Sequence, residues 1–522
     1  MLWLVGVLCA GAAAYAYLFV APLLFYTDNY VYLLLGEAWA SGQGQTNIWT
    51  GLPIPHRQYP PGYPMLLGLA MRLGLESVTA FKLVNGVLFG ASIGLAYGWG
   101  RRVVGDREAA MLACAFIALN VALLRFASLV MTEIPFVAST LLALYALARS
   151  RSEQLVWRDG WFWLMIASTI ASFYIRSVGV ALAFAVGVGL AFERRWGRAA
   201  LASAVTFAAW LPWWLRGREL GSTYSSYFTT WIVPGDAGAS AAALVRRVAG
   251  NVWGYLSVSF PEALTPAIQP VIDLAPVLAA CCSVLALAAA FWGWKGLRQD
   301  RAVVGVYLLA TTALHLIWPV HWNTYRFVLP VVPVLTVLAT WGGLRAAGAV
   351  LSRGAAEGAP RPGPASAVLG LPLLLLVLPG LYVAKNWDGH RPSTLEIRHL
   401  VAAEWVQDHV PEGAAAIAAA RPATVHYLTR RYVGAPRSGA TPEETIAMLR
   451  ADGFGYVLVT ANRSDHPIFA RVVPAIEAHP EQFELLEAIA RPDSGEGAYP
   501  YYTALYRILP EPEADEAAAY GP

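Results

Sequence analysis

Charged side chains recur at the ends of long apolar stretches, where a charge is costly and its position is therefore informative. Asp28 follows the first apolar stretch, and Glu133 opens a later one. The other charged or polar residues in comparable positions are Lys82, Arg125, Arg176, His321, Tyr325 and Arg326. If these ends lie at one depth of a membrane, a helical bundle would gather two carboxylates and several cations in one polar cavity.

This set of residue types suits transfer of a sugar from a lipid phosphate. The guanidinium group of Arg presents a planar fork of donors that matches a phosphate group. A carboxylate within hydrogen-bond reach of an acceptor hydroxyl can take its proton as the oxygen attacks the anomeric carbon. Because the leaving phosphate is already a stable anion, one base and cationic stabilisation of the leaving charge would suffice.

Each of these residues also has a purely structural interpretation. Asp28 is suited to cap the helix that follows it, and Glu133 to stabilise the positive end of its own helix. Arg125 and Arg326 could reach lipid headgroups from the ends of their helices. The common position of the whole set favours function over these separate explanations.

The composition indicates a polytopic membrane protein. Of the 522 residues, 57% are hydrophobic and only 14% are charged, whereas soluble domains have roughly 45–50% apolar and about 25% charged residues. This excess is too large for one hydrophobic core. The net charge of +3 gives no indication of a nucleic-acid partner. All four cysteines lie in apolar stretches, so neither a disulfide framework nor a zinc site is implied.

A membrane-spanning helix needs about 20 mostly apolar residues. By that criterion the sequence predicts about eleven spans, at 2–24, 78–99, 108–128, 133–149, 160–176, 177–193, 199–215, 274–294, 302–319, 326–347 and 366–384. Residues 61–74 are apolar but short, so we expect a partly inserted helix there.

The basic residues predict the orientation, because they collect in short cytoplasmic loops. Five alternate loops carry three cations each, within 101–107, 149–158, 194–198, 295–301 and 345–361. We therefore place these loops inside and expect the loops 25–64 and 216–273, and all residues after 385, outside. The long loop 216–273 is either a lid over an active site or a plain connector.

After residue 385 the composition becomes that of a soluble α/β domain. We expect helices at 395–409 and 441–449, a buried strand at 455–460 and a closing strand pair at 483–489 and 501–508. The sequence thus predicts two domains, a membrane domain at 1–384 and an extracytoplasmic α/β domain at 385–522. The second domain has no Gly-rich phosphate loop, so we assign it no chemistry.

Four motifs together resemble a known family. They are the acidic residue after the first span, an outer loop ending in PPGYPMLLGLAMRLG, MTEIPF at the start of a later span, and YRFVLPVVPVL after a short outer loop. The pattern resembles membrane glycosyltransferases of the GT-C fold, in particular the protein O-mannosyltransferases and the aminoarabinose transferases acting on lipid A. The resemblance covers residues 1–384. It implies an inverting, polyprenyl-phosphate-sugar-dependent transferase of the bacterial plasma (inner) membrane, with its site on the non-cytoplasmic face.

The resemblance also implies roles for single residues. The catalytic acidic position falls on Asp28 and a second acidic position on Glu133. Donor phosphate binding is expected of Arg326, Arg176, Arg125, Lys82 and Tyr325. Contacts to acceptor or sugar are expected of Tyr30, His56, Arg57, Tyr59 and His321. No metal requirement can be carried over; if a divalent metal is used, Asp28 and Glu133 are its candidate ligands.

The sequence departs from the family pattern at Asn29, where mannosyltransferases carry a second acidic residue, and at Tyr59, where the lipid A enzymes carry Lys. Sugar and acceptor identity therefore stay open, and the acceptor can be a lipid, a glycan or a protein. The main alternative is a secondary transporter or flippase of lipid-linked sugars, although the sequence shows no paired repeat of the kind such folds carry. A third possibility is a scaffold that binds an envelope partner.

Overall fold

The computed structural model describes residues 2–21, 23, 27–150, 155–221, 241–264, 269–320, 324–353, 381–382, 385, 394–437, 439–460, 468–490 and 500–510. His321 and most of the predicted span 366–384 lie outside the described residues. The chain forms two compact units. The first comprises Met1–Leu23, Arg57–Leu66 and Leu73–His390, and the second comprises Leu24–His56, Leu67–Arg72 and Arg391–Pro522.

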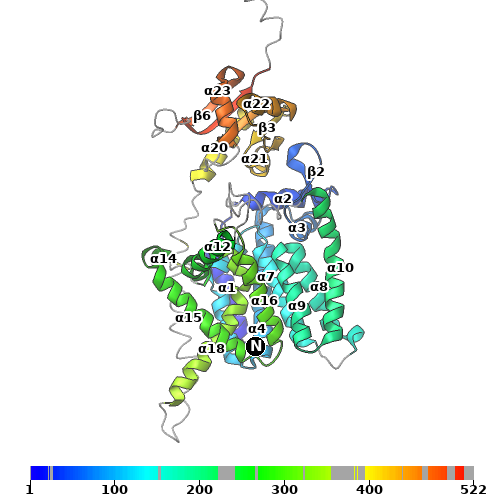
Figure 1. Cartoon of the computed structure of the whole chain (residues 1–522), viewed down its shortest axis with the longest axis vertical. Helices are drawn as coiled ribbons and strands as arrows, with labels where there is room; N and C mark the ends of the chain where they lie inside the picture. Colours follow the sequence, from blue (N-terminus) through cyan, green and yellow to red (C-terminus); the bar gives the residue numbers. More distant parts are fainter. Residues whose placement is uncertain are drawn as a thin grey trace, which may run out of the picture. The chain divides into compact units, whose positions relative to one another are not determined.

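The first unit is helical (Figure 1). Its helices are α1 (Leu2–Leu18), α4 (Val78–Val104), α5 (Arg107–Ala118), α6 (Val121–Ala127), α7 (Glu133–Arg149), α8 (Gly160–Ile175), α9 (Val180–Phe192), α10 (Trp196–Leu220), α12 (Ala241–Gly254), α13 (Phe260–Leu264), α14 (Gln269–Leu274), α15 (Pro276–Lys295), α16 (Arg301–Leu316), α17 (Tyr325–Val328) and α18 (Val332–Arg353). Each of the first ten predicted spans overlaps at least one of these helices. Helix α3 (Gly62–Arg72) occupies the short apolar piece and runs from the first unit into the second.

Length and composition single out a smaller set of these helices. Among the described residues, α4, α15 and the continuous stretch Tyr325–Ala349 are long and apolar enough to cross a membrane, and the bent pair α5–α6 makes a fourth if it is one span. The remaining apolar helices are shorter, with 10–17 residues. The structure therefore supports a membrane protein with several spans, and the number eleven stays a prediction.

The third predicted span is bent rather than straight. Helices α5 and α6 meet at an angle of 57°. Asn120 lies at the break, where its side chain accepts a hydrogen bond from Leu123 N at 2.8 Å and donates one to Ala263 O at 2.9 Å. An Asn side chain that bonds the local backbone competes with the helical ladder, which explains the break.

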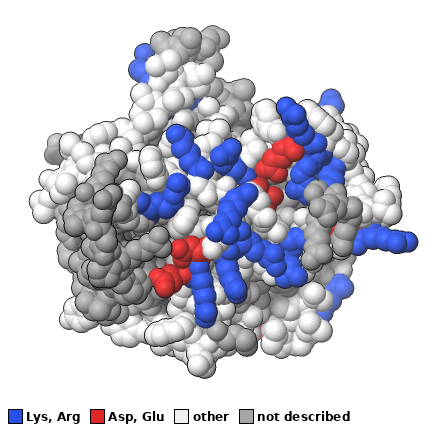
Figure 2. All heavy atoms as spheres, turned by 90° about the horizontal axis from the view of Figure 1, so that it is seen from below, with Lys and Arg blue, Asp and Glu red and all other residues white. Residues whose placement is uncertain are grey.

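Lys and Arg gather on the face of the molecule that Figure 2 shows, and only a few acidic side chains lie among them. Exposed cations in the loops that the sequence places inside are Arg101, Arg102, Arg107, Arg158, Arg194, Lys295, Arg298 and Arg301. A face rich in cations is what the inner surface of a membrane protein is expected to carry. The orientation itself remains a prediction.

The second unit contains a five-stranded sheet with the order β4-β3-β5-β7-β6. The strands are β3 (Ala416–Ala419), β4 (Val433–Gly434), β5 (Phe454–Thr460), β6 (Phe483–Ala490) and β7 (Tyr501–Ile508). Strand β3 pairs in parallel with β4 and β5, while β7 pairs antiparallel with β5 and β6. The helices of this part are α20 (Thr394–His409), α21 (Pro422–Thr429), α22 (Pro442–Ala451) and α23 (Val473–Ala478).

Alternation along β5 places apolar side chains on both faces of this sheet. Val457 and Val459 pack with residues of α22 and α23, whereas Tyr456 and Leu458 pack with residues of α20 and α21. The predicted helices and strands after residue 394 are confirmed. Strands β3 and β4 were not predicted because they are only four and two residues long.

The segment that follows the first apolar helix forms part of the second unit. It contains α2 (Thr27–Ala40) and the short antiparallel pair β1 (Thr46–Asn47) and β2 (Ile54–Pro55). Helix α2 packs against α21. The outer loop that the sequence predicts is therefore in part a helix, and its partner lies almost 400 residues further along the chain.

Candidate active site

Glu133 is the first residue of α7, and its side chain is fully buried. Arg176 Nη1 and Arg326 Nε both donate hydrogen bonds to Oε1 of this carboxylate. Arg176 Nη1 also donates to Thr132 Oγ1 at 3.1 Å. The side chains of Arg176 and Arg326 are 11% and 21% exposed. The structure thus brings together one carboxylate and two cations from three separate segments, and we call Glu133, Arg176 and Arg326 the arginine cluster.

A tight turn directs Arg176 toward Glu133. Arg176 ends α8 in an extended conformation and is followed by the 3-10 turn Ser177–Gly179. A Cβ at Gly179 would lie 2.5 Å from Phe173 N. Only glycine therefore lets the chain fold back this closely, and the fold-back sets the position of Arg176.

Asn85 holds the turn that precedes Glu133. It lies in α4, is fully buried, and its Nδ2 donates to Leu129 O at 2.6 Å and to Met131 O at 3.3 Å. Those carbonyls belong to the non-helical residues between α6 and α7, which would otherwise leave polar groups unpaired. The sequence analysis missed Asn85, although an amide inside an apolar stretch is a signal that could have found it.

The charge of the arginine cluster favours an anion over a cation. With one carboxylate and two guanidinium groups its formal charge is +1, and Oε2 of Glu133 has no hydrogen-bond partner among the described residues. A divalent cation at Glu133 would lie beside two positive charges. The described residues also contain no group of three or more His, Cys, Asp and Glu side chains placed to hold a metal. These two charges disfavour a cation at this position, and the role of Glu133 as a metal ligand stays a prediction.

Three further residues are expected to bind the donor phosphate: Tyr325, Arg125 and Lys82. Tyr325 precedes Arg326 and packs edge-on against Phe126, with ring centroids 5.8 Å apart. Arg125 lies in the last turn of α6, next to Phe126 in the sequence. Lys82 is fully buried in α4, and its Nζ donates to Val20 O at 2.7 Å. Lys82 thus satisfies a backbone carbonyl just after the first helix, a structural role that the sequence did not predict.

Asp28 lies in the first turn of α2 and is half-buried. Tyr30, two residues on, is buried and packs against Tyr427 of α21, with ring centroids 5.0 Å apart. Burial is the main cause that raises the pKa of the Tyr30 hydroxyl, and nearby Tyr427 and Glu396 raise it further. Tyr30 is therefore a neutral packing residue at neutral pH.

The remaining predicted sugar contacts have different surroundings. His56 is 6% exposed, and its Nδ1 lies 2.7 Å from Asn47 Oδ1, so it ties β2 to β1. Arg57 is exposed and Tyr59 is half-buried, and both lie in the first unit. His56 was predicted to contact the acceptor or the sugar, and the structure shows in addition that its ring is hydrogen-bonded to Asn47.

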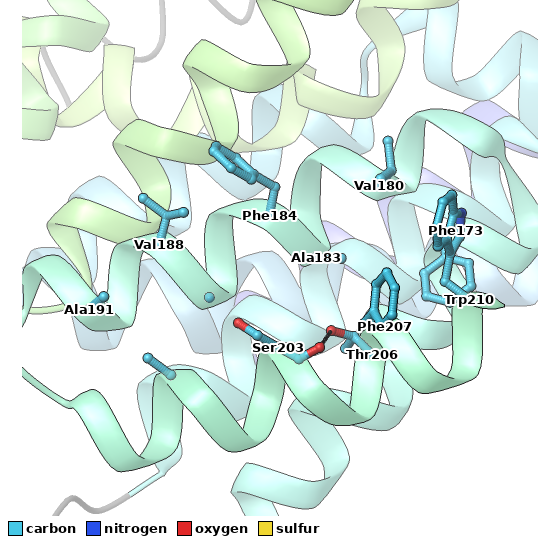
Figure 3. Close-up of a pocket in the computed structure, with 12 residues that line it drawn as sticks. Phe173, Val180, Ala183, Phe184, Val188, Ala191, Ser203, Thr206, Phe207 and Trp210 are labelled. Carbon is cyan, nitrogen blue, oxygen red and sulfur yellow. Dashed lines mark hydrogen bonds between the residues drawn. The ribbon is translucent and has the colours of Figure 1, made fainter. Parts of the chain in front are cut away.

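An apolar groove runs between α9 and α10, which lie side by side (Figures 1 and 3). Its volume is about 470 Å³, and its lining residues include Phe184 and Val188 of α9 and Phe207 and Trp210 of α10. The groove begins at Phe173, three residues before Arg176. Among its few polar residues, Thr206 donates its hydroxyl to Ala202 O at 2.7 Å. The groove therefore offers apolar surface to a hydrocarbon chain.

Comparison with known proteins places this geometry in a wider context. Residues 76–234 match the family model of dolichyl-phosphate-mannose-protein mannosyltransferases. No curated protein sequence matches the chain. Among solved structures, the chain is similar to ArnT from Cupriavidus metallidurans bound to undecaprenyl phosphate, with 14% identity, 97% of each chain covered and a TM-score of 0.59.

A second similar structure is the oligosaccharyltransferase of Archaeoglobus fulgidus tethered to an acceptor peptide. It is 13% identical, with 94% of this chain and 73% of that chain covered and a TM-score of 0.55. The same enzyme in complex with zinc and sulfate is 12% identical, with a TM-score of 0.56 and coverage of 97% and 74%. These likenesses show the fold. The resemblance that the motifs predicted is confirmed: together with the family-model match, these likenesses support a membrane glycosyltransferase of the GT-C fold.

Proposed function

We propose that this enzyme transfers a sugar, with inversion, from a polyprenyl-phosphate donor to an acceptor hydroxyl on the extracytoplasmic face of a bacterial plasma membrane. The observation that carries the proposal is the arginine cluster, a buried site with two guanidinium groups and one carboxylate. Arg176 uses only Nη1 toward Thr132 and Glu133. Because a guanidinium has five N–H donors, others remain for the oxygens of a phosphate group.

The apolar groove between α9 and α10 supports a lipid-linked donor. It begins beside the segment that carries Arg176. An amphiphile whose anionic head binds Arg176 has apolar surface available for its tail at this place. The undecaprenyl phosphate bound to the similar ArnT structure also supports a donor of this class.

In the proposed reaction Asp28 takes the proton of the acceptor hydroxyl as its oxygen attacks the anomeric carbon. The bond between that carbon and the phosphate oxygen breaks, and the electron pair leaves with the phosphate. Arg176 and Arg326 stabilise the charge that develops on the leaving group. Glu133 holds both guanidinium groups in place. The acceptor is a lipid, glycan or protein hydroxyl, and the long segment 216–273 and the C-terminal α/β part shape its access.

The test compares purified wild-type protein with R176Q and R326Q in transfer from a panel of radiolabelled polyprenyl-phosphate sugars to an envelope extract. We expect each substitution to lower turnover by about 100-fold or more, the usual effect of removing one donor that stabilises a developing negative charge. R437Q is the matched control, because Arg437 is 66% exposed and pairs with Asp452 at the surface. Movement of lipid-linked sugars across proteoliposomes, without a covalent product, would instead establish a transporter.

A further inference from the structure

The sheet of the α/β part has a topological switch point. Strand β3 lies between β4 and β5 and runs parallel to both. The chain leaves β3 through α21 to reach β4, and it then returns through α22 to β5. Residues of α21 pack on one face of the sheet and residues of α22 on the other. In open α/β sheets, ligands bind at such a point, in the crevice outside the carboxyl ends of the strands.

Helix α21, with eight residues, begins at this edge of the sheet without a cap. Arg421 is its N-cap residue and makes no side-chain capping hydrogen bond. Pro422 has no N–H, and among the described residues the backbone N–H groups of Ala423 and Thr424 have no acceptor. Ala423 is 4% exposed and Thr424 is fully buried. A buried helix start with unpaired N–H groups is suited to bind an anion.

Three buried hydroxyl groups lie at the same edge. Thr460 is the last residue of β5, and Thr503 is its cross-strand neighbour in β7. Both are at most 3% exposed, and Thr424 in the first turn of α21 is fully buried. Within the described part of the chain, none of these three hydroxyl oxygens has a hydrogen-bond partner. Because an unpaired buried polar group is costly, three of them at one edge indicate a polar ligand.

The strand register brings these hydroxyl groups to the start of α21. Ala419, the last residue of β3, pairs with Leu458, so Thr460 lies two positions further along, level with the residues that lead into α21. Residues two apart on a strand share a face, and Leu458 packs on the face that α21 covers. Thr503 shares this face as the direct neighbour of Thr460. The side chain of Thr424 leans toward the start of its own helix.

We propose that this edge of the α/β part is a binding site for a phosphate group. The N–H groups of Ala423 and Thr424, at the positive end of α21, bind its negative charge. The hydroxyl groups of Thr424, Thr460 and Thr503 donate to its oxygens. The phosphate group belongs either to a soluble molecule or to a lipid headgroup. The arginine cluster lies in the other compact unit, so this inference does not rest on the proposed function.

Hydrogen exchange followed by mass spectrometry tests this site directly. Full-length protein in phosphatidylcholine nanodiscs is exchanged at equal ionic strength in chloride, in inorganic phosphate, and in chloride with phosphatidic acid added to the nanodiscs. The peptide that covers the start of α21 reports on the N–H groups of Ala423 and Thr424. T424V and T503V remove hydroxyl groups from two different elements, so that a folding defect in one variant does not decide the result. T429V is the matched control, because the Thr429 hydroxyl in the same helix already donates to Val425 O at 2.7 Å.

In wild type and T429V we expect phosphate to slow exchange of this peptide in a saturable manner. T424V and T503V should each raise the concentration for half-maximal slowing by about tenfold or more, since each removes one hydrogen bond to a charged group. Slower exchange with phosphatidic acid identifies a lipid headgroup as the source, and slower exchange with inorganic phosphate alone identifies a soluble phosphate. Equal exchange under all three conditions, or an unchanged half-maximal concentration in both variants, overturns the inference.

Discussion

The side chain of Glu133 is fully buried, and the guanidinium groups of Arg176 and Arg326 compensate its negative charge. Burying an unpaired carboxylate would cost several kcal/mol. The sequence predicted Glu133, Arg176 and Arg326 as site residues, because each is a costly charge at the end of an apolar stretch. It did not predict that Arg176 and Arg326 share one oxygen of Glu133, because that depends on how three separate segments pack.

Replacing Glu133 with Ala removes the negative charge and leaves two partly buried cations without their partner. We expect E133A to lower the free energy of unfolding by roughly 3 kcal/mol or more. Thermal unfolding in detergent would show this as a lower midpoint. E404A, at an exposed position of α20, serves as the control. An E133A midpoint equal to that of wild type would show that the two arginines do not depend on Glu133.

Asp300, immediately before the first residue of α16, is 7% exposed, and its Oδ1 lies 3.8 Å from Nη1 of Arg195. Burial, reinforced by Glu193, raises the pKa of its carboxyl from 3.8 to about 7. A pKa raised in the folded state means that the folded protein holds the proton more tightly. Stability from this group is therefore complete below about pH 4 and is lost as the pH rises to about 7.

We accordingly expect D300N to unfold at a higher temperature than wild type at pH 8 and to differ little at pH 4. Asn also tolerates the left-handed backbone at this residue, where φ is 54°. Thermal unfolding of both proteins between pH 4 and pH 8 measures the difference. A difference that does not change with pH would contradict the raised pKa of Asp300.

At the scale of elements, apolar length predicts where most helices of the first unit lie, and strand and capping signals predict much of the α/β part. The elements that position the site are less visible in the sequence. The break at Asn120, the turn held by Asn85 and the fold-back at Gly179 each depend on contacts with a distant segment. Sequence patterns record local periodicity, and these contacts leave no periodic trace.

The turn before Glu133 gives a direct test at this scale. N85L keeps a side chain of similar size but removes the donor for the carbonyls of Leu129 and Met131. Leaving buried carbonyls unpaired should cost roughly 1–3 kcal/mol in the free energy of unfolding. We expect a lower unfolding midpoint together with slower transfer. G94A in the same helix is the control, because a Cβ there meets nothing within 4 Å. Unaltered stability of N85L would show that the turn needs no such bond.

At the scale of the whole molecule, each compact unit is assembled from segments that are far apart in the chain. The sequence analysis placed 25–64 with the membrane helices, because a loop is expected to belong with the elements that it connects. The structure groups α2 with the C-terminal part instead, through contacts such as that between Glu37 and Arg430, which are 393 positions apart. No spacing rule connects residues at that separation.

Charge reversal tests this grouping. E37R and R430E should each weaken the packing of α2 on α21, and the double variant E37R/R430E should recover part of the loss. Since Arg430 is 55% exposed, we expect a coupling of only about 0.2–1 kcal/mol. Unfolding midpoints of the four proteins give the coupling by a double-mutant cycle. If the changes in the free energy of unfolding caused by E37R and R430E were strictly additive in the double variant, a direct ion pair between Glu37 and Arg430 would be contradicted.

The central claim, covalent sugar transfer with Asp28 as base, is tested most directly by one comparison. Wild-type protein and D28N are purified and incubated with a labelled polyprenyl-phosphate sugar and an envelope extract. The proposed function predicts a covalent product and free polyprenyl phosphate from wild type, and turnover lower by at least about 100-fold in D28N. Turnover by D28N close to that of wild type would contradict it.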